Sequence, residues 1–474
     1  MTQLQIPSKL VLKTTPKADW QGTLTLLPVP APQMPNPDKP GQQVGDILAG
    51  PNQVIVSVGP AEKLRTANIR KAGISAAAWL IKHGVTAIGL SVSALDHLKI
   101  DDALEAFCEG LSLGAFDFNL YKSKADDSII NVFILTEEGD ASSAEKIMRV
   151  DTLVSGVNLA REWSHEPPNV INPITLAERA QALAAKTGLR YTVFDQDILK
   201  QMGAGAILSV GLGSKTPSQM ILLEHAGKDK SGDSPPVVVI GKAITFDTGG
   251  YSLKNKQGIV GMKFDKCGGM AVLGIMQVVA ALNLPVRVIG IVAAAENMIS
   301  SNAYRPNDII TSLSGKTIEI ISTDAEGRMV LSDALTYAST ELKPRAIIDL
   351  ATLTGGVVTA LGQVRAGLMS NNNDLADELI SAGERCDELL WRLPLDEEYF
   401  ELIKGSDSDL KNSAGKPLAS AIVGGTFLKQ FVLNDIPWAH IDIAGMATVE
   451  SGLRGNSATG YGVRLLIDYL QNLS

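Results

Sequence analysis

The hydrophobic and polar positions in the first third of the chain alternate between the period of a strand and that of a helix. Strand patterns occupy five segments, at residues 9–14, 22–27, 54–58, 87–90 and 129–135. Apolar residues with helical spacing lie between them at 61–82 and 101–113, and a proline-rich loop covers 28–41. Strands that alternate with helices predict a small α/β domain. We find no catalytic motif in it.

A long helix is predicted from Ser142 onward. It ends at Pro167 and Pro168, because consecutive prolines cannot continue the backbone hydrogen-bond ladder. We interpret this helix as a connector, which gives an N-terminal domain at 1–150, a linking helix at 151–168 and a larger domain at 169–474. His165 lies near the carboxyl end of the helix, where a histidine usually stabilises the helix dipole or faces solvent.

The second half continues the alternation of strands and helices. Its segments are a helix at 174–187, a strand at 190–194, apolar segments at 207–210, 220–224 and 236–244, a helix near 268–282, and strands at 286–293 and 346–350. Strands rich in valine and isoleucine between helices predict a mostly parallel or mixed central sheet that is covered on both faces. Functional residues of such sheets lie beyond the carboxyl ends of the strands.

Length and composition limit the possible classes of protein. A chain of 474 residues exceeds one ordinary core, so two domains are expected. The 51 acidic residues outnumber the 42 lysines and arginines, and the net charge of −9 argues against nucleic acid or an anionic membrane as the main partner. No apolar run approaches the roughly 20 residues that span a bilayer, and the amino terminus lacks the pattern of a secretory signal. Three widely spaced cysteines favour a reducing, cytoplasmic environment.

The first candidate site is the stretch at residues 321–331, where two carboxylates and a guanidinium occupy alternate positions. In an extended backbone, Asp324, Glu326 and Arg328 would point to one side and converge. Carboxylate oxygens suit hard divalent cations, and Gly327 lets the backbone approach closely. The alternative is a solvated acidic turn before a helix, with Glu326 at the favourable amino-terminal end.

A second candidate site lies between residues 237 and 271. Lys242 ends a segment with the pattern of a buried strand, and burial would lower the pKa of its amine, which could then bind a metal. The alternative is a lysine whose ammonium extends past the strand end to solvent. Asp247 and Asp265 each precede a pair of glycines, so both carboxylates are expected on turns at strand ends.

Together the two stretches supply four carboxylates and one lysine, enough to bind two divalent ions through shared oxygens. Such a pair of ions activates a water molecule and polarises a carbonyl group. Without a metal, four converging carboxylates would repel one another. Lys254 and Arg328 remain as cations that could stabilise an oxyanion or hold an anionic helper. Only five histidines are present, so oxygen ligands must provide most of any metal site.

These motifs, in this order, resemble the leucyl aminopeptidase family, the dizinc exopeptidases of the cytosolic leucine aminopeptidase and peptidase A type. The family signature Asn-Thr-Asp-Ala-Glu-Gly-Arg is matched at 322–328, and Gly-Lys-Gly-x-Thr-Phe-Asp-Ser/Thr-Gly-Gly at 241–250. Shorter matches lie at 161–173, 252–254, 262–265, 351–355 and 438–445. The resemblance is strong over residues 150–474 and looser before them.

The resemblance implies a cytoplasmic, homohexameric aminopeptidase that removes neutral, mostly apolar N-terminal residues, preferably leucine, from peptides. Residues 169–474 would be its catalytic metallopeptidase domain. One tightly held zinc or manganese ion would bind to Lys242, Asp247, Asp265 and Glu326. A more exchangeable ion would bind to Asp247, Asp324 and Glu326, so that Asp247 and Glu326 bridge the two.

The resemblance also implies roles around the metals. The free amine of the substrate would bind the tight metal, while its carbonyl oxygen would meet the other metal and Lys254. A hydroxide held by both metals would attack, and a bicarbonate near Arg328 would act as the general base. The pocket for the first side chain would be formed by Met262, Thr352, Gly355, Ala444 and Ala447. Their apolar, partly small character predicts large aliphatic or aromatic first residues, whereas the alternative for Met262 is ordinary core packing.

Three residues depart from the family pattern. Ser322 replaces the asparagine of the family pattern, which could weaken a hydrogen bond that supports the metal ligands without removing a ligand. Ala243 replaces a glycine, and Lys266 replaces an apolar residue beside Asp265. We expect these two changes to alter the metal preference or to attract a peptide carboxylate.

Three other functions compete with this prediction. Some relatives of this fold are DNA-binding accessory proteins, which the acidic composition argues against. An inactive homologue would have lost a ligand, and no ligand position is lost. Residues 314–317, Ser-Gly-Lys-Thr, resemble the end of a phosphate-binding loop, but Ile310 stands where its first glycine should be.

Overall fold

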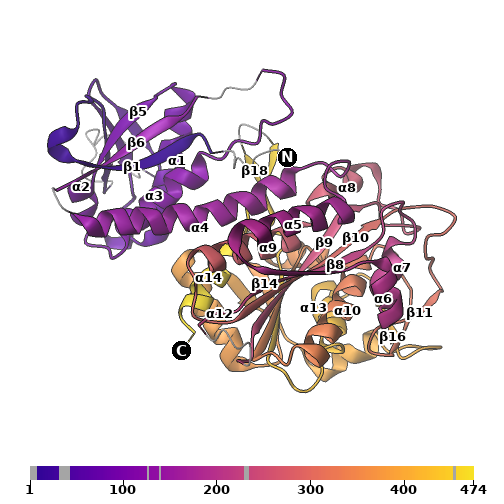
Figure 1. Ribbon diagram of the computed structural model, residues 1–474. Helices are drawn as coiled ribbons and strands as arrows, with labels where there is room; N and C mark the ends of the chain where they lie inside the picture. Colours follow the sequence, from indigo (N-terminus) through magenta and orange to yellow (C-terminus); the bar gives the residue numbers. More distant parts are fainter. Residues whose placement is uncertain are drawn as a thin grey trace. The chain divides into compact units, whose positions relative to one another are not determined.

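The computed structural model describes residues 8–30, 43–124, 128–137, 140–228, 234–451 and 455–473. The chain forms two compact units, Met1–Asn158 and Leu159–Ser474. Helix α4 (Ala141–His165) passes from the first unit into the second (Figure 1). Both units are α/β and the second is the larger, as the sequence predicts. The division between the two units lies within helix α4.

The first unit is built on a six-stranded sheet with the order β1-β6-β5-β2-β4-β3. All neighbouring strands are parallel except β3, which pairs antiparallel with β4. Its strands are β1 (Leu10–Pro16), β2 (Thr25–Val29), β3 (Ile47–Ala49), β4 (Gln53–Ser57), β5 (Ala87–Ser91) and β6 (Ile130–Thr136). Its helices are α1 (Thr66–Lys82), α2 (Val92–Asp96), α3 (Ala103–Gly114) and most of α4. Residues 31–41 of the predicted proline-rich loop lie outside the described residues.

Helices α1 and α3 pack unusually closely because glycines line their contact. A Cβ on Gly110 would lie 2.0 Å from the main-chain oxygen of Arg70, and one on Gly73 would lie 2.4 Å from that of Phe107. The same helices bury Ile69, Leu80 and Leu111 in the core of the unit. The predicted helix at 61–82 is interrupted, because its first residues form a separate 3₁₀ turn (Ala61–Lys63).

The second unit is built on a mixed eight-stranded sheet with the order β15-β14-β17-β13-β9-β10-β8-β7. The four central strands, β17, β13, β9 and β10, are mutually parallel. The strands are β7 (Arg190–Phe194), β8 (Gln219–His225), β9 (Val237–Asp247), β10 (Val288–Asn297), β13 (Ala346–Ala351), β14 (Ala366–Ser370), β15 (Leu390–Arg392) and β17 (Trp438–Asp442). Two small sheets contain β11 (Ile309–Thr311), β12 (Thr317–Glu319) and β16 (Leu410–Lys411), and β18 (Thr448–Ser451) and β19 (Gly455–Ala458).

Helices cover both faces of this sheet (Figure 1), as the valine- and isoleucine-rich strands predict. One layer contains α5 (Pro173–Thr187), α9 (Cys267–Ala281) and α14 (Val463–Gln471); the other contains α7 (Gly205–Gly211), α10 (Glu326–Glu341) and α13 (Ser420–Lys429). The remaining helices are α6 (Gln196–Met202), α8 (Lys256–Ile259), α11 (Gly355–Leu361) and α12 (Asn373–Cys386). The short apolar segment at 207–210, which is too short for its period to be assigned, lies in helix α7.

The carboxyl ends of the four central parallel strands meet at one edge of the sheet. Their last residues are Asp442, Ala351, Asp247 and Asn297. This edge is where ligands bind in open α/β sheets. The stretch Met262–Ala281 is long and apolar enough to cross a bilayer by composition, but 83% of its most apolar 18 residues are buried, as expected of a core helix.

Candidate metal centre

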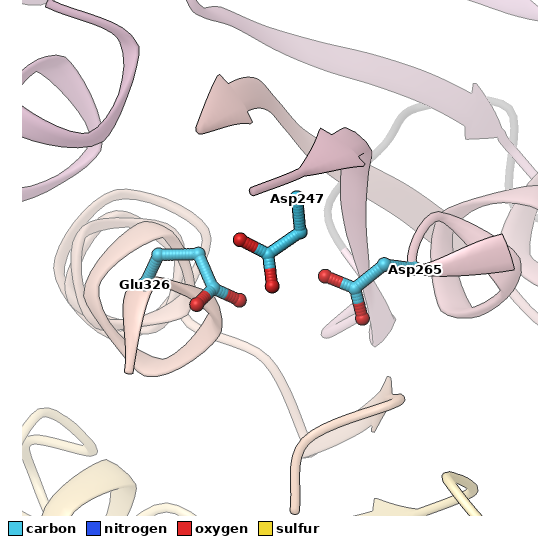
Figure 2. A group of neighbouring side chains, drawn as sticks. All are labelled: Asp247, Asp265 and Glu326. Carbon is cyan, nitrogen blue, oxygen red and sulfur yellow. The ribbon is translucent and has the colours of Figure 1, made fainter. Parts of the chain in front are cut away.

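Three carboxylates from separate parts of the chain gather at this edge. Asp247 ends β9, Asp265 follows the 3₁₀ turn Met262–Phe264, and Glu326 is the first residue of α10. One oxygen of each lies within 4.8 Å of the others, and Figure 2 shows the three groups turned toward one another. All three side chains are buried.

The backbone of the stretch at 321–331 is not extended, so the sequence-based geometry is wrong. Ala325 is the N-cap of α10, and Glu326 and Arg328 lie in the first turn of the helix. The helical spacing that begins at Met329 therefore extends back to Glu326, where a carboxylate favours the helix amino terminus. The turn-and-helix alternative describes the backbone correctly, but Glu326 is only 2% exposed and is not solvated. Asp324, on the preceding turn, is partly exposed, and 36% of its side chain is accessible to solvent.

Lys242 lies in the middle of β9 rather than at its end, and it does not reach solvent. Its Nζ donates to Asp265 Oδ1 at 2.8 Å and to the main-chain oxygen of Thr352 at 2.9 Å, and it lies 2.9 Å from Glu326 Oε1. Burial lowers the pKa of Lys242, but the carboxylates of Asp265, Glu326 and Asp247 outweigh burial and raise it above the ordinary value. The expected lowering considered burial alone and is wrong for this arrangement, so a metal could bind the Lys242 amine only in exchange for its proton.

Lys254 lies between the two remaining carboxylates of the centre. Its Nζ is 2.8 Å from Asp247 Oδ2 and 2.5 Å from Asp324 Oδ1. The turn before it requires Gly249 and Gly250, whose φ angles are +86° and +61°. This turn brings the chain back, so that the Lys254 side chain faces Asp247 across it.

The centre opens into a cavity of about 450 Å³. Its polar lining includes the five predicted ligands and Lys254. The same cavity is lined by all five predicted pocket residues, Met262, Thr352, Gly355, Ala444 and Ala447. Arg328 lies away from this lining, and its guanidinium donates to the main-chain oxygen of Asn412 at 2.7 Å.

The donor set fits a divalent cation. Asp265 Oδ2 and Glu326 Oε2 are buried and have no hydrogen-bond partner within the described residues. Burial, with the charges of Glu326 and Asp247, raises the pKa of Asp265 to about 8 against the opposing effect of Lys242. Burial and the charge of Glu326 likewise raise the pKa of Asp324 to about 6. Carboxylates that resist ionisation because they lie close together and are wholly or partly buried are the groups that a divalent cation stabilises.

Residues behind the carboxylates were not found from the sequence. Asn297 donates from Nδ2 to Asp247 Oδ1 at 2.8 Å and to the main-chain oxygen of Thr323 at 3.0 Å. Thr352, predicted as a pocket residue, also donates from its hydroxyl to Asp265 Oδ1 at 2.8 Å. In the sequence, only the position of Asn297 at the end of an apolar strand indicates that it could contact Asp247.

Lys266 has a structural environment that the sequence did not indicate. It is fully buried, and its Nζ donates to the main-chain oxygens of Ser164, Glu166 and Lys263, at 3.0, 3.0 and 2.5 Å. It therefore caps the carboxyl end of α4 and cannot attract a peptide carboxylate. Burial lowers its pKa to about 7. The hydroxyl of Ser322, the other polar departure, accepts the main-chain N–H of Asp324 at 3.2 Å.

Two further predictions concern residues away from the centre. His165 is buried, where it was expected to face solvent or the helix dipole, and its Nε2 accepts the N–H of Ala458 at 3.1 Å. Burial, with the charge of Lys263, lowers the pKa of His165 to about 3, so its imidazole is neutral. Residues 314–316 lie in the turn between antiparallel strands β11 and β12, and Thr317 begins β12, so this segment is not a strand-to-helix loop. A phosphate-binding loop is thereby excluded.

The fold and the site together define a class: a two-domain α/β protein whose larger unit carries an oxygen-rich centre suited to divalent metals. Comparison with known proteins gives the family. The catalytic-domain model of the cytosol aminopeptidase family matches residues 158–467, and the model of the family's N-terminal domain matches residues 50–125. The chain belongs to this family, and it is a metal-dependent aminopeptidase, a hydrolase of peptides.

Relatives are similar over most of their length. A probable cytosol aminopeptidase of Geobacter sulfurreducens is 43% identical over 427 residues, which cover 88% of this chain and 84% of the relative. One of Clostridium tetani is 40% identical over 87% of this chain and 86% of the relative. Among solved structures, the bottromycin maturation enzyme BotP in complex with Mn has a TM-score of 0.87 at 28% identity, covering 95% of this chain and 99% of BotP.

Proposed function

We propose that this aminopeptidase removes neutral, mostly apolar N-terminal residues, leucine foremost, from short peptides with the help of two divalent metal ions. The single observation that carries the proposal is the cavity of about 450 Å³, in which the acidic centre and the apolar pocket residues meet. Small-molecule sites combine an apolar lining with a few polar groups in this way. The polar end would hold the peptide's amine and scissile bond, and the apolar end its first side chain.

The proposed ligands of one ion are Lys242, Asp247, Asp265 and Glu326, and those of a second are Asp247, Asp324 and Glu326. Support comes from the close approach of three of the carboxylates and from the two buried carboxylate oxygens without partners. When bound, two such ions activate a water molecule and polarise a carbonyl group. Asn297 and Thr352 would hold the carboxylates of Asp247 and Asp265 in the orientation that the ions require.

Two cations are proposed to act on the substrate and its base. Lys254 would donate to the scissile carbonyl oxygen as negative charge develops there, because it lines the cavity and its Nζ lies beside the carboxylates of Asp247 and Asp324. Arg328, which does not line the cavity itself, would hold a bicarbonate that extends from its guanidinium toward the attacking water and accepts the proton of that water. Its buried Nε has no partner within the described residues, so an N–H of the guanidinium is available to an anion.

The nature of the metal and the assembly belong to the same proposal. Zinc or manganese is the proposed metal, and the related enzyme BotP was solved in complex with Mn. Three free, buried cysteines, Cys108, Cys267 and Cys386, agree with the proposed cytoplasmic location. A homohexamer is proposed from the family resemblance. The DNA-binding alternative gains no support from the relatives, which are named as aminopeptidases.

The proposal is tested by removing metal with a chelator and adding back Zn, Mn, Co or Mg. Activity is then measured on p-nitroanilides of leucine, phenylalanine, alanine, lysine and glutamate. We expect activity to be lost with the chelator, to return with Mn or Zn, and to be highest for leucine. An equal rate for all side chains, or activity that survives the chelator, would contradict it.

Variants test the ligand assignment directly. Asp265→Ala and Glu326→Ala are expected to lower kcat/KM for the leucine substrate by at least about 100-fold, because loss of a group that only orients a metal ligand already costs about 10–100-fold. Asp333→Asn is the matched control, because Asp333 is equally buried in α10 but accepts hydrogen bonds from Ile207 and Leu313 instead. Calorimetric titration with Mn should show binding to the control and not to the other two.

A further inference from the structure

A buried carboxylate outside the proposed ligands connects two loops of the cavity wall. Asp442, the last residue of β17, is fully buried. Its Oδ1 accepts the main-chain N–H of Leu353 at 3.1 Å and that of Ala444 at 3.2 Å. Its Oδ2 accepts the hydroxyl of Thr354 at 2.6 Å. The three donor residues all line the cavity.

The topology explains why one side chain can reach both loops. Strands β13 and β17 are parallel neighbours, and Ala351 at the end of β13 pairs with Asp442. The chain leaves both strands at the same edge of the sheet. After β13 it forms the loop with Leu353 and Thr354, and after β17 it forms the segment that begins with Ala444. The Asp442 carboxylate lies at the start of both.

The contact with Thr354 extends to the pocket itself. The Thr354 hydroxyl donates to Asp442 and also accepts the N–H of Val357 at 3.2 Å, as the N-cap of helix α11. This helix begins at Gly355, one of the predicted pocket residues. A Cβ built on Gly355 meets no atom within 4 Å, so this residue borders open space.

The polarity of the network requires a carboxylate. An ionised carboxylate only accepts hydrogen bonds, so the Thr354 hydroxyl must donate to it and keeps a lone pair for Val357. An asparagine at 442 would present an NH₂ group to one of its neighbours. If that neighbour is Thr354, the hydroxyl receives two donors and its own proton loses its acceptor. Charge-assisted hydrogen bonds are also stronger than neutral ones, so the wall would be held less firmly.

We propose that Asp442 is a positioning residue that sets the shape of the pocket for the substrate's first side chain. It acts through Leu353, Thr354 and Ala444, and it touches neither the metals nor the scissile bond. The inference rests on the proposed function and names a residue that determines its specificity. Loss of the carboxylate should change which side chains are preferred, while metal binding stays the same.

The experiment compares full-length wild type with Asp442→Asn, Thr354→Val and Thr354→Ser. It measures kcat/KM on the leucine, phenylalanine and alanine p-nitroanilides and the affinity for Mn. We expect the leucine-to-alanine ratio to fall about tenfold in Asp442→Asn and Thr354→Val, which corresponds to about 1.4 kcal/mol. Thr354→Ser keeps the hydroxyl and should retain the wild-type ratio. Mn affinity should stay within about threefold of wild type, a change below 1 kcal/mol.

Asp349→Asn is the matched control. Asp349 is also fully buried, on neighbouring β13, but its carboxylate binds His440 Nδ1 at 2.5 Å and Trp438 Nε1 at 2.7 Å. Neither partner lines the cavity. This variant is expected to lose stability and to keep the wild-type leucine-to-alanine ratio.

Two outcomes overturn the inference. One is an unchanged ratio in Asp442→Asn or, should that variant fail to fold, in Thr354→Val. The other is a ratio that falls equally in Asp349→Asn, which would mean a general loss of structure. Calorimetric binding of leucine and alanine hydroxamates requires no turnover. It therefore tests the role of Asp442 independently of the proposed peptidase activity. A wild type that binds these probes without hydrolysing peptides contradicts the proposed function, whereas an unchanged affinity ratio in Asp442→Asn contradicts the role of Asp442.

Discussion

Each lysine of the candidate centre lies between two carboxylates. Lys242 lies between Asp265 and Glu326, and Lys254 between Asp247 and Asp324. Buried charges are tolerated only when they are paired, because their desolvation costs several kcal/mol per ion. The two lysines therefore allow four carboxylates to converge at the sheet edge and remain available to a metal. Removal of either lysine would leave buried negative charge without compensation.

Gly355 provides a direct test of where the first side chain binds. We expect Gly355→Val to fold normally, because its new methyl groups point toward open space and the glycine does not have a positive φ. The added volume should lower kcat/KM for the leucine substrate by at least about tenfold, on the scale of a lost methylene or two in an apolar pocket. The alanine substrate serves as the internal control and should be hydrolysed as before. Equal losses on both substrates would show that the side chain does not bind there.

Asp333 provides a pH test of buried charge in helix α10. Burial raises its pKa from the ordinary 3.8 to about 7, while N–H groups of Leu313 and Ile207 oppose the rise. Between pH 4 and 7 the folded protein therefore binds more protons than the unfolded chain, so stability falls as the pH rises and levels off above 7.

The comparison with Asp333→Asn isolates this effect. Relative to wild type, the variant should gain stability from pH 5 to 7, by at most about 1.4 kcal/mol per pH unit, and gain nothing more above pH 8. Urea unfolding at pH 5, 6, 7 and 8 measures the difference. A difference that is constant across this range would mean that Asp333 does not titrate in it.

At the scale of elements, close packing in this protein depends on small residues at crossing points. Helices α1 and α3 approach through Gly73 and Gly110, where any side chain would meet main-chain atoms of the partner helix. Near the centre, a Cβ on Gly327 of α10 would lie 2.7 Å from Lys242 Nζ of β9. Helix and strand must approach this closely for Glu326 to meet Lys242. Gly327, next to the proposed ligand Glu326, is therefore required for packing as well as being part of the sequence motif.

Gly110→Ala is predicted to destabilise the first unit by about 1–3 kcal/mol, because its Cβ would overlap the main-chain oxygen of Arg70. Hydrogen exchange should show faster exchange in α1 and α3, with peptides of the second unit unchanged. Gly50→Ala is the control in the same unit, since its nearest contacts are at an ordinary 3.8 Å. Equal effects of the two substitutions would contradict the packing argument.

At the scale of the whole molecule, each unit has a hydrophobic core of its own. The candidate centre lies entirely in the second, Leu159–Ser474. Its candidate ligands come from β9, from the turn before α9 and from the start of α10. A ligand that binds here should therefore stabilise the second unit alone. Anything that binds only the folded state stabilises it in proportion to the logarithm of its concentration.

Metal addition provides the corresponding measurement. Mn at about 100 times its Kd is expected to stabilise the second unit by about 2.7 kcal/mol. Hydrogen exchange should slow in β9 and at the start of α10 and remain the same in β1 to β6. Asp265→Ala should abolish the response. Slower exchange that persists in this variant would place the metal elsewhere.

The sequence alone determined the α/β class, most strands and helices, and the residues that meet in the cavity. Strand and helix periods report which side of an element is buried, and motif spacing reports residue chemistry, so both can be read without a fold. The tertiary structure decided that a helix begins at Glu326, that neighbouring carboxylates raise the pKa of Lys242, and that Lys266 points into the end of α4. It also showed that Asn297 contacts Asp247 and that Asp442 connects two loops of the cavity wall. These outcomes depend on partners up to about a hundred residues away, such as Leu353 for Asp442, and local patterns carry no information about which distant group fills the space beside a side chain.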